Sequence, residues 1–176
     1  MVQPADDSSE VSRLVDAARA GDRAAFGRLY ERYGRVVHGI LLSRVPPDEV
    51  ADLVQDVFLL AMRRLHSLRE PAAFGGWLVA IARNRANDFH RRSPNLEELD
   101  EEMASKNLEE AEARAVLVAI GQLPAAYRET LVLRLVEGMT GPEIAARTGL
   151  TPGSVRVNLH RGMEQLREKL GKGNKP

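Results

Sequence analysis

The chain has 176 residues, of which 44% are hydrophobic and 28% charged, and its 25 basic and 25 acidic side chains give a formal net charge of zero. This composition excludes wholesale disorder and is typical of a soluble globular protein with one ordinary domain or two small ones. The absence of cysteine excludes disulfides and thiolate chemistry, and no apolar run approaches the roughly 18 residues that a membrane span needs.

An all-α fold is predicted, because only 5% of the residues are aromatic while Ala, Leu, Arg and Glu are abundant. The polar, acidic start of the chain does not resemble a signal peptide, so a cytoplasmic location is expected, with residues 1–8 disordered. Apolar spacing and helix-breaking residues then predict four helices, over residues 10–20, 22–44, 47–65 and 71–92. Gly34 and Gly39 weaken the second helix, and Pro46-Pro47 ends it.

Two of these helices carry polar faces opposite their apolar stripes. On the third helix the polar face consists of Asp48, Asp52, Gln55 and Asp56. On the fourth, four polar residues follow one another at i, i+4, i+7 and i+8: Asn84, Asp88, Arg91 and Arg92. Trp77 belongs to the apolar series of the fourth helix, which favours a packing role for it.

Residues 93–107 contain a proline and an acidic run, which predict a linker. Helices over 109–123 and from Pro124 to near Gly138 are expected after it. Residues 69–92 have a net charge of +3 and residues 147–172 of +4, whereas residues 93–115 have −6. Two basic blocks around an acidic one indicate two surfaces for an anionic partner, although ordinary solvated helix faces would give the same pattern.

The stretch TGPEIAARTGLTPGSVRVNLHRG, residues 140–162, contains two helix starts separated by a glycine. Thr140 and Glu143 have the spacing of a capping box, and Gly149 is the usual residue for a left-handed C-cap. Thr151 caps a second helix with Pro152 at its first position. This pattern predicts a helix-turn-helix, in which the small Ala145 and Ala146 let the two helices cross closely.

The second helix of this motif is expected to run from Pro152 to about Leu170 and to read the DNA major groove. Arg forms two hydrogen bonds with guanine and Asn two with adenine, and a residue at the helix start can contact phosphate or a base. The alternative is a helical hairpin within a bundle. The inward residues are Val155, Leu159, Met163, Leu166 and Leu170, and the outward ones are Ser154, Arg156, Val157, Asn158 and Arg161.

Three stretches together resemble the bacterial extracytoplasmic-function (ECF) sigma factors of the sigma-70 family, over about residues 10–171. DLVQDVFLLAMRRL looks like the helix that binds core RNA polymerase (region 2.2). FGGWLVAIARNRANDFHRR is similar to the helix that melts the promoter and reads the −10 element (regions 2.3–2.4). QLPAAYRETLVLRLVEGMTGPEIAARTGLTPGSVRVNLHRGMEQLREKL looks like region 4, which reads the −35 element.

The resemblance implies a domain organisation and a set of partners. Region 2 is expected over residues 10–92, a flexible acidic linker over 93–108 and region 4 over 109–172. A protein of this family is not an enzyme, needs no cofactor or metal, acts as a monomer, and binds the β′ clamp helices and β flap of polymerase, promoter DNA and an anti-sigma factor. The linker would run near the polymerase active site and RNA exit, or act merely as a solubilising spacer.

The resemblance also implies roles for individual residues. The −35 element would be read by Thr151 with Ser154, Arg156, Val157, Asn158 and Arg161. Asn84 aligns with the position that helps to hold a base flipped out of the −10 strand, and the loop containing Ser67 and Arg69 would help to form that pocket, with Asp88, Arg91 and Arg92 on the same side. The clamp helices would contact Asp48, Asp52, Gln55 and Asp56, with Leu59 or Leu60 packing at the contact.

Two departures from the family pattern concern the recognition helix. Members of the family often have a small or basic residue at the position of Val157 and an arginine near the position of Asn158. Gly162 is expected to interrupt the helix where alanine is commoner. Both leave the −35 preference open.

Other functions fit the sequence less well. His38, His66, His90 and His160 lack metal-ligand spacing, and no phosphate-binding glycine-rich loop is present. A stand-alone helix-turn-helix repressor or activator would account for residues 109–171 but not for the polar helices upstream. A sigma-like decoy that binds only an anti-sigma factor should have lost Asn84, Arg91, Arg156 and Arg161, and all four are present.

Overall fold

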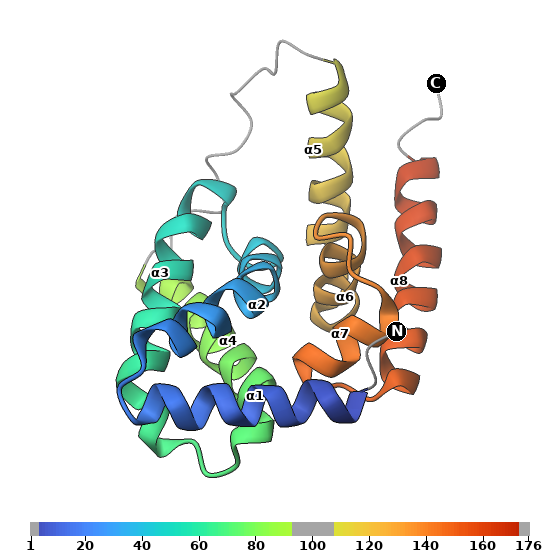
Figure 1. Cartoon of the computed structure of the whole chain (residues 1–176). Helices are drawn as coiled ribbons and strands as arrows, with labels where there is room; N and C mark the ends of the chain where they lie inside the picture. Colours follow the sequence, from blue (N-terminus) through green and yellow to red (C-terminus); the bar gives the residue numbers. More distant parts are fainter. Residues whose placement is uncertain (1–3, 93–107, 173–176) are drawn as a thin grey trace.

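The computed structural model describes residues 4–92 and 108–172, and within these ranges every regular element is helical, as predicted (Figure 1). The expected linker, apart from Leu108, lies outside the described residues. The first module comprises α1 (Pro4–Arg19), α2 (Arg23–Leu42), α3 (Pro47–Arg64), the 3-10 turns η1 (Leu65–Ser67) and η2 (Pro71–Ala73), and α4 (Phe74–Arg92). The second module comprises α5 (Leu108–Gly121), α6 (Ala125–Leu135), α7 (Gly141–Thr148) and α8 (Pro152–Lys172).

Local chemistry sets the helix ends of the first module. Helix α1 begins at Pro4, so the expectation of disorder up to residue 8 is wrong for residues 4–8. Gly21, with φ of 97°, turns the chain after α1. The side chain of Asp22 then accepts hydrogen bonds from the backbone N–H groups of Ala24 and Ala25, at 2.8 and 3.1 Å, which confirms it as the N-cap of α2.

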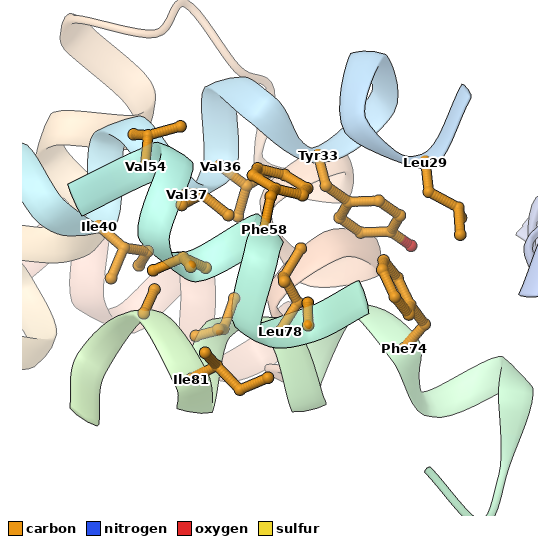
Figure 2. Packing of buried hydrophobic residues seen from close by; sticks show 14 of the residues in the cluster. Leu29, Tyr33, Val36, Val37, Ile40, Val54, Phe58, Phe74, Leu78 and Ile81 are labelled. Carbon is orange, nitrogen blue, oxygen red and sulfur yellow. The ribbon is translucent and has the colours of Figure 1, made fainter. Parts of the chain in front are cut away.

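The core of the first module lies between α2, α3 and α4 (Figure 2). Leu29 and Ile40 of α2 and Phe74 and Leu78 of α4 are completely buried, and each such side chain stabilises the fold by roughly 1.5–3 kcal/mol. Tyr33 packs edge-on against Phe74 with ring centroids 5.2 Å apart, and burial raises the pKa of its phenol. Trp77 is half-buried against this cluster, which confirms its packing role.

The second module is built on a close crossing of α6 and α8. Gly162 is buried at this crossing, where a Cβ atom would lie 3.1 Å from the Leu131 side chain and 3.2 Å from the Tyr127 Cβ. Helix α8 continues through Gly162, so the expected interruption of the helix is wrong. The glycine instead lets the two helix backbones approach.

The two modules pack against each other, which the sequence patterns do not indicate. Figure 1 shows α6 and α7 on the side of the first module formed by α2 and α4, and these elements are in contact. Leu133, Met139, Ile144 and Val155 of the second module are each at most 3% exposed and belong to the same hydrophobic cluster as the core of the first. The chain is therefore closed into a single packed body.

Candidate nucleic-acid interface

The predicted helix-turn-helix is present as α7 and α8, and its caps are those expected from the sequence. The backbone N–H of Thr140 donates to Glu143 at 2.8 Å, and the backbone N–H of Glu143 donates to the Thr140 hydroxyl at 3.4 Å, which confirms the capping box. Gly149 ends α7 with φ of 76°. At the start of α8 the Thr151 hydroxyl accepts from the Ser154 backbone N–H at 3.1 Å. These bonds fix the turn between the two helices.

Helix α8 presents a polar face to solvent and an apolar face to the module. Ser154, Arg156, Val157 and Arg161 are exposed, and Asn158 is half-buried. Val155 and Leu166 are buried, but Leu170 is 39% exposed, so the expected inward position of Leu170 is wrong. Ala145 is buried at the crossing, while Ala146 is exposed.

We expect the capping box to make the stability of the protein depend on acid pH. The backbone N–H of Thr140 lowers the pKa of Glu143, its hydroxyl lowers it further, and the charges of Arg147 and Arg35 add to this effect against a small rise from burial. A carboxyl whose pKa is lower in the folded state contributes stability above its unfolded pKa of about 4.3 and loses it as pH falls through the folded pKa. Urea unfolding between pH 2.5 and 7 should therefore show wild type more stable than Glu143→Gln at neutral pH, with the difference vanishing in acid. A pH-independent difference would contradict this role.

A groove of about 440 Å³ lies between α3 and α4 and contains three of the six predicted −10 residues. Asn84, Asp88 and Arg91 line it from α4, with the Arg91 guanidinium paired to the Asp88 carboxylate. Its lining combines the apolar side chains of Leu60 and Ile81 with amide, carboxylate and guanidinium groups. This combination suits a flat, polar-edged ligand such as a nucleobase.

The groove differs in part from the pocket expected from the sequence. Ser67, Arg69 and Arg92 do not line it; Ser67 instead donates from its hydroxyl to the Arg64 carbonyl at 2.7 Å. Five lining residues were not predicted from the sequence: Leu60, Arg64, Ile81, Arg85 and Asn87. Asn87 follows Asn84 by about one helical turn and could have been detected from that spacing, whereas Leu60 and Arg64 belong to α3 and gave no local signal.

The acidic face of α3 is exposed at every predicted position, namely Asp48, Asp52, Gln55 and Asp56. Asp56 lies 3.8 Å from the Arg85 guanidinium, a contact too long and exposed to neutralise it. Next to this face is an apolar hollow of about 270 Å³. The hollow is lined by Phe26, Tyr30, Gln55, Phe58, Leu59 and Met62.

This apolar hollow extends the predicted contact surface beyond Leu59. Leu59 is 48% exposed, Met62 49% and Tyr30 43%. The Tyr30 ring packs at a tilt against Phe58, with ring centroids 4.5 Å apart, and Phe58 is itself part of the buried core. Met and aromatic residues beside a charged face are typical of protein-binding surfaces. Tyr30 and Met62 were not predicted from the sequence, because Tyr30 belongs to α2 and Met62 to α3 and only the packing of these helices brings them together.

No helix among the described residues is both long and apolar enough to cross a membrane.

Comparisons with known proteins agree with this geometry. The family model "Sigma-70 region 2" matches residues 29–94, and "Sigma-70, region 4" matches residues 113–166. The ECF RNA polymerase sigma-E factor of Haemophilus influenzae is 32% identical over 180 residues, which cover 89% of this chain and 93% of that protein. RNA polymerase sigma factor CarQ of Myxococcus xanthus is 35% identical over 166 residues, covering 89% and 95%. ECF RNA polymerase sigma factor BldN of Streptomyces coelicolor is 33% identical over 173 residues, covering 91% of this chain but 66% of the longer relative.

A solved structure of CnrH in complex with the cytosolic domain of CnrY has a TM-score of 0.65 and 27% sequence identity, and the match covers 94% of this chain and 99% of that one. Both family models fall in the predicted order, one on each module. The chain therefore belongs to the extracytoplasmic-function sigma factors of the sigma-70 family, and it is a transcription initiation factor that directs RNA polymerase to promoters.

Proposed function

We propose that the first module binds core polymerase and melts and recognises the −10 element, while α8 of the second module recognises the −35 element. The observation that carries this proposal is the pairing, in one chain, of a groove lined by amide, carboxylate and guanidinium groups of α4 with a cap-defined recognition helix at α8. A regulator that reads duplex DNA needs only the second of these features.

The −35 element would be read by the exposed face of α8. Arg156 and Arg161 would form paired hydrogen bonds with guanines and Asn158 with adenine, while the Val157 side chain, 44% exposed, would contact a thymine methyl group. Thr151 and Ser154, whose hydroxyl oxygens lie 2.8 Å apart at the helix start, would contact phosphate.

The −10 element would be recognised in the groove between α3 and α4. An unstacked base would enter it, with the amide of Asn84 and the carboxylate of Asp88 reading its Watson–Crick edge. Arg91 and Arg92 would contact the backbone of the melted strand, and Ser67 and Arg69 would contact DNA outside the groove. Arg64 and Arg85 add two further cations at the groove, which supports a polyanionic ligand.

Core polymerase would bind the acidic face of α3 and the adjoining apolar hollow. The carboxylates of Asp48, Asp52 and Asp56 would pair with basic residues of the β′ clamp helices, and Leu59 and Met62 would pack at the contact. We further propose that α5–α8 contact the β flap, that residues 93–108 link the two modules, and that an anti-sigma factor binds the chain. The last of these is supported by CnrH, which was solved with the cytosolic domain of a second protein, CnrY.

The proposal is tested by transcription with purified components. Core polymerase alone and core with this chain are incubated with a genomic promoter library, and discrete run-off transcripts should appear only with the chain present. Asn84→Ala should still form closed complexes but should reduce open complexes roughly tenfold or more, because one hydrogen-bonded base contact contributes about 1–3 kcal/mol. Permanganate reactivity of unpaired thymines measures the open complex.

Two outcomes would overturn the proposal. A chain that binds duplex DNA alone as a dimer, without any effect on core polymerase, would be a stand-alone repressor or activator. Equal loss of closed and open complexes in Asn84→Ala would assign Asn84 to duplex binding and not to the melted strand.

A further inference from the structure

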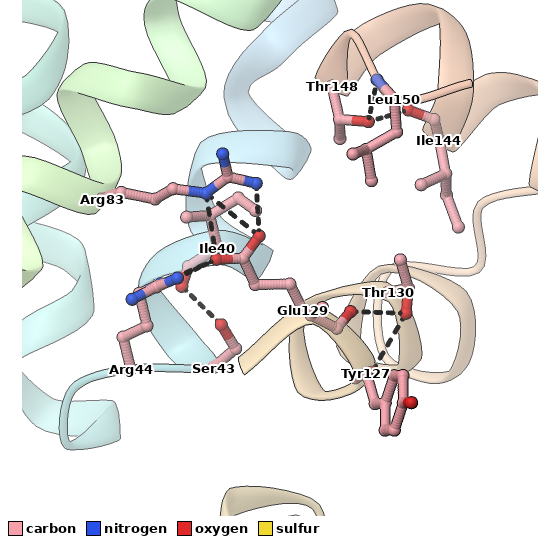
Figure 3. A network of polar contacts seen from close by, with 11 residues as sticks. Ile40, Ser43, Arg44, Arg83, Tyr127, Glu129, Thr130, Ile144, Thr148 and Leu150 are labelled. Atoms are coloured by element: carbon pink, nitrogen blue, oxygen red, sulfur yellow. Dashed lines mark hydrogen bonds and ion pairs between the residues drawn. The ribbon is translucent and has the colours of Figure 1, made fainter. Parts of the chain in front are cut away.

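Among the residues whose burial the structure describes, the most buried carboxylate lies at the contact between the two modules. Glu129 of α6 is 4% exposed, and the guanidinium groups of Arg44 and Arg83 converge on its carboxylate (Figure 3). Arg83 binds with both Nε and Nη2: Nε lies 3.1 and 3.2 Å from the two oxygens, and Nη2 lies 2.7 Å from Oε2. The Nε of Arg44 donates to Oε1 at 2.8 Å. The second module thus supplies the anion, and the first supplies both cations.

Glycines in the first module make room for this contact. A Cβ atom on Gly39 would lie 2.7 Å from Leu133 Cδ2 and 3.0 Å from Glu137 Cγ, both in the second module. A Cβ atom on Gly75 would lie 2.5 Å from the Arg147 carbonyl oxygen of α7. A glycine inside a helix costs about 1 kcal/mol relative to alanine, and the three atoms nearest to the place of a Cβ on Gly39 all belong to the second module. The closed packing of the second module explains this cost.

A second carboxylate reinforces the same contact. Glu137 is 8% exposed, and its carboxylate accepts a hydrogen bond from His38 Nδ1 at 2.6 Å. The same carboxylate lies 3.7 Å from the Arg35 guanidinium. Arg147 also donates to the Arg32 backbone carbonyl at 2.6 Å. Polar contacts therefore join the modules along α2, α4, α6 and α7.

The closed arrangement does not fit simultaneous reading of two promoter elements. A compact chain of this length has a radius of gyration of about 16 Å, hence a diameter of about 40 Å. Elements two helical turns apart are separated by about 70 Å. Reading both elements, as in the proposed function, therefore requires α6 and α7 to leave α2 and α4, and this exposes Arg44 and Arg83.

The exposed pair has the properties of a phosphate site. The two-point contact of Arg83 with Glu129 is the geometry by which arginine also binds phosphate. Arg83 directly precedes Asn84 on α4, so it lies on the same helix as the groove that the proposed function assigns to the −10 strand, although it is not one of the residues that line this groove. Both arginines already keep part of their side chains in solvent, 17% for Arg44 and 36% for Arg83, so an anion can approach them.

We propose that Arg44 and Arg83 form a binding site for a DNA backbone phosphate, and that Glu129 occupies this site in the closed chain and so holds the modules in a form that cannot bind a promoter. This inference rests on the proposed function. DNA and Glu129 compete for the same two cations, and engagement of DNA therefore favours the open form.

Opening is measured first, without DNA. The chain has no cysteine, so Ala24→Cys on α2 and Glu168→Cys on α8, both exposed, accept spin labels at two defined positions only. Gly39→Ala and Glu129→Gln should add a population with a longer inter-label distance. Gly34→Ala is the matched control, because it lies on the same helix and its added methyl meets no described atom within 4 Å. Distances unchanged in both Gly39→Ala and Glu129→Gln would overturn the proposal that Glu129 holds the modules in the closed form.

The phosphate site is measured with a 40-base-pair duplex of mixed sequence over a series of NaCl concentrations. Glu129→Gln and Arg83→Gln both break the same ion pair, so a contact that only latches the modules would give the same change in both. A phosphate site gives opposite changes. Glu129→Gln should bind DNA several-fold more tightly, and Arg83→Gln should bind more weakly, with the slope of log affinity against log salt reduced by about 1.

Two controls correct for the altered charge. Glu164→Gln removes a carboxylate from the exposed part of α8, and Arg28→Gln removes an exposed arginine of α2. Changes in the same direction for Glu129→Gln and Arg83→Gln, or effects equalled by these controls, would overturn the site. Failure of the proposed function would give a different result. The wild-type chain would then give no transcripts with core polymerase, regardless of the inter-label distances and the duplex affinities.

Discussion

Replacing both Asp52 and Asp56 of α3 with arginine should weaken binding to core polymerase about a hundredfold or more. Reversing charges that face basic partners replaces attraction with repulsion, and such changes cost several kcal/mol, with about 1.4 kcal/mol for each tenfold in affinity. Both side chains are exposed, so the fold should survive. Only the weak contact of Asp56 with Arg85, 3.8 Å long, is lost within the chain. Fluorescence anisotropy of labelled protein titrated with core measures the affinity.

A control with the same change in net charge tests whether the loss of affinity is specific to the acidic face of α3. Asp16→Arg with Glu31→Arg changes the net charge equally, and both residues are exposed on α1 and α2. This control should bind core with wild-type affinity. Wild-type affinity of the Asp52/Asp56 variant, or equal weakening of the control, would refute the role of the acidic face.

Replacing Arg156 and Arg161 of α8 with alanine should abolish −35-dependent promoter binding while leaving core binding intact. Each paired arginine–guanine contact contributes about 1–3 kcal/mol, so loss of both lowers affinity about a hundredfold, with about tenfold per 1.4 kcal/mol. Neither guanidinium supports the fold, since both side chains are exposed. Footprinting of the holoenzyme on promoters mapped by run-off transcription measures the effect at each element.

Arg167→Ala provides the comparison on the same helix. Arg167 is exposed on α8, but it lies well beyond the residues near the helix start that are proposed to face the DNA major groove. Its loss should lower affinity only slightly and without regard to the −35 sequence. If promoter affinity survives in Arg156→Ala with Arg161→Ala, or if Arg167→Ala matches their loss, α8 is not the recognition helix.

Elements governed by neighbouring residues could be predicted from the sequence. The capping box at Thr140 and Glu143, the left-handed Gly149 and the cap at Asp22 depend on side chains within three residues of the backbone groups they satisfy. The exposed face of α3 followed from helical periodicity in the same way. The family resemblance rested on such local patterns, and both family models match where they occur.

Features that join distant residues could not be predicted. Arg44 and Arg83 are 85 and 46 residues from Glu129, and no local pattern distinguishes this glutamate from the others in the sequence. The one available sign was Gly39, which the sequence alone marks only as a weak point in α2. Likewise, the groove at Asn84 takes Leu60 and Arg64 from α3, while the loop residues Ser67 and Arg69 remain outside it.

Gly162 has a consequence for how promoter preference can change. At Gly162, which has no side chain, the backbone of α8 lies directly against Leu131 and Tyr127, and this contact is the pivot about which α8 could tilt. Arg161 adjoins this pivot and Arg156 lies nearly two turns from it, so a small tilt there swings the start of α8 through a larger arc. A methyl group at this position requires either that the Leu131 and Tyr127 side chains give way by a few tenths of an ångström or that α8 tilts. A tilt would re-aim the reading surface without altering any side chain on it, so promoter preference could change through a residue that touches no base.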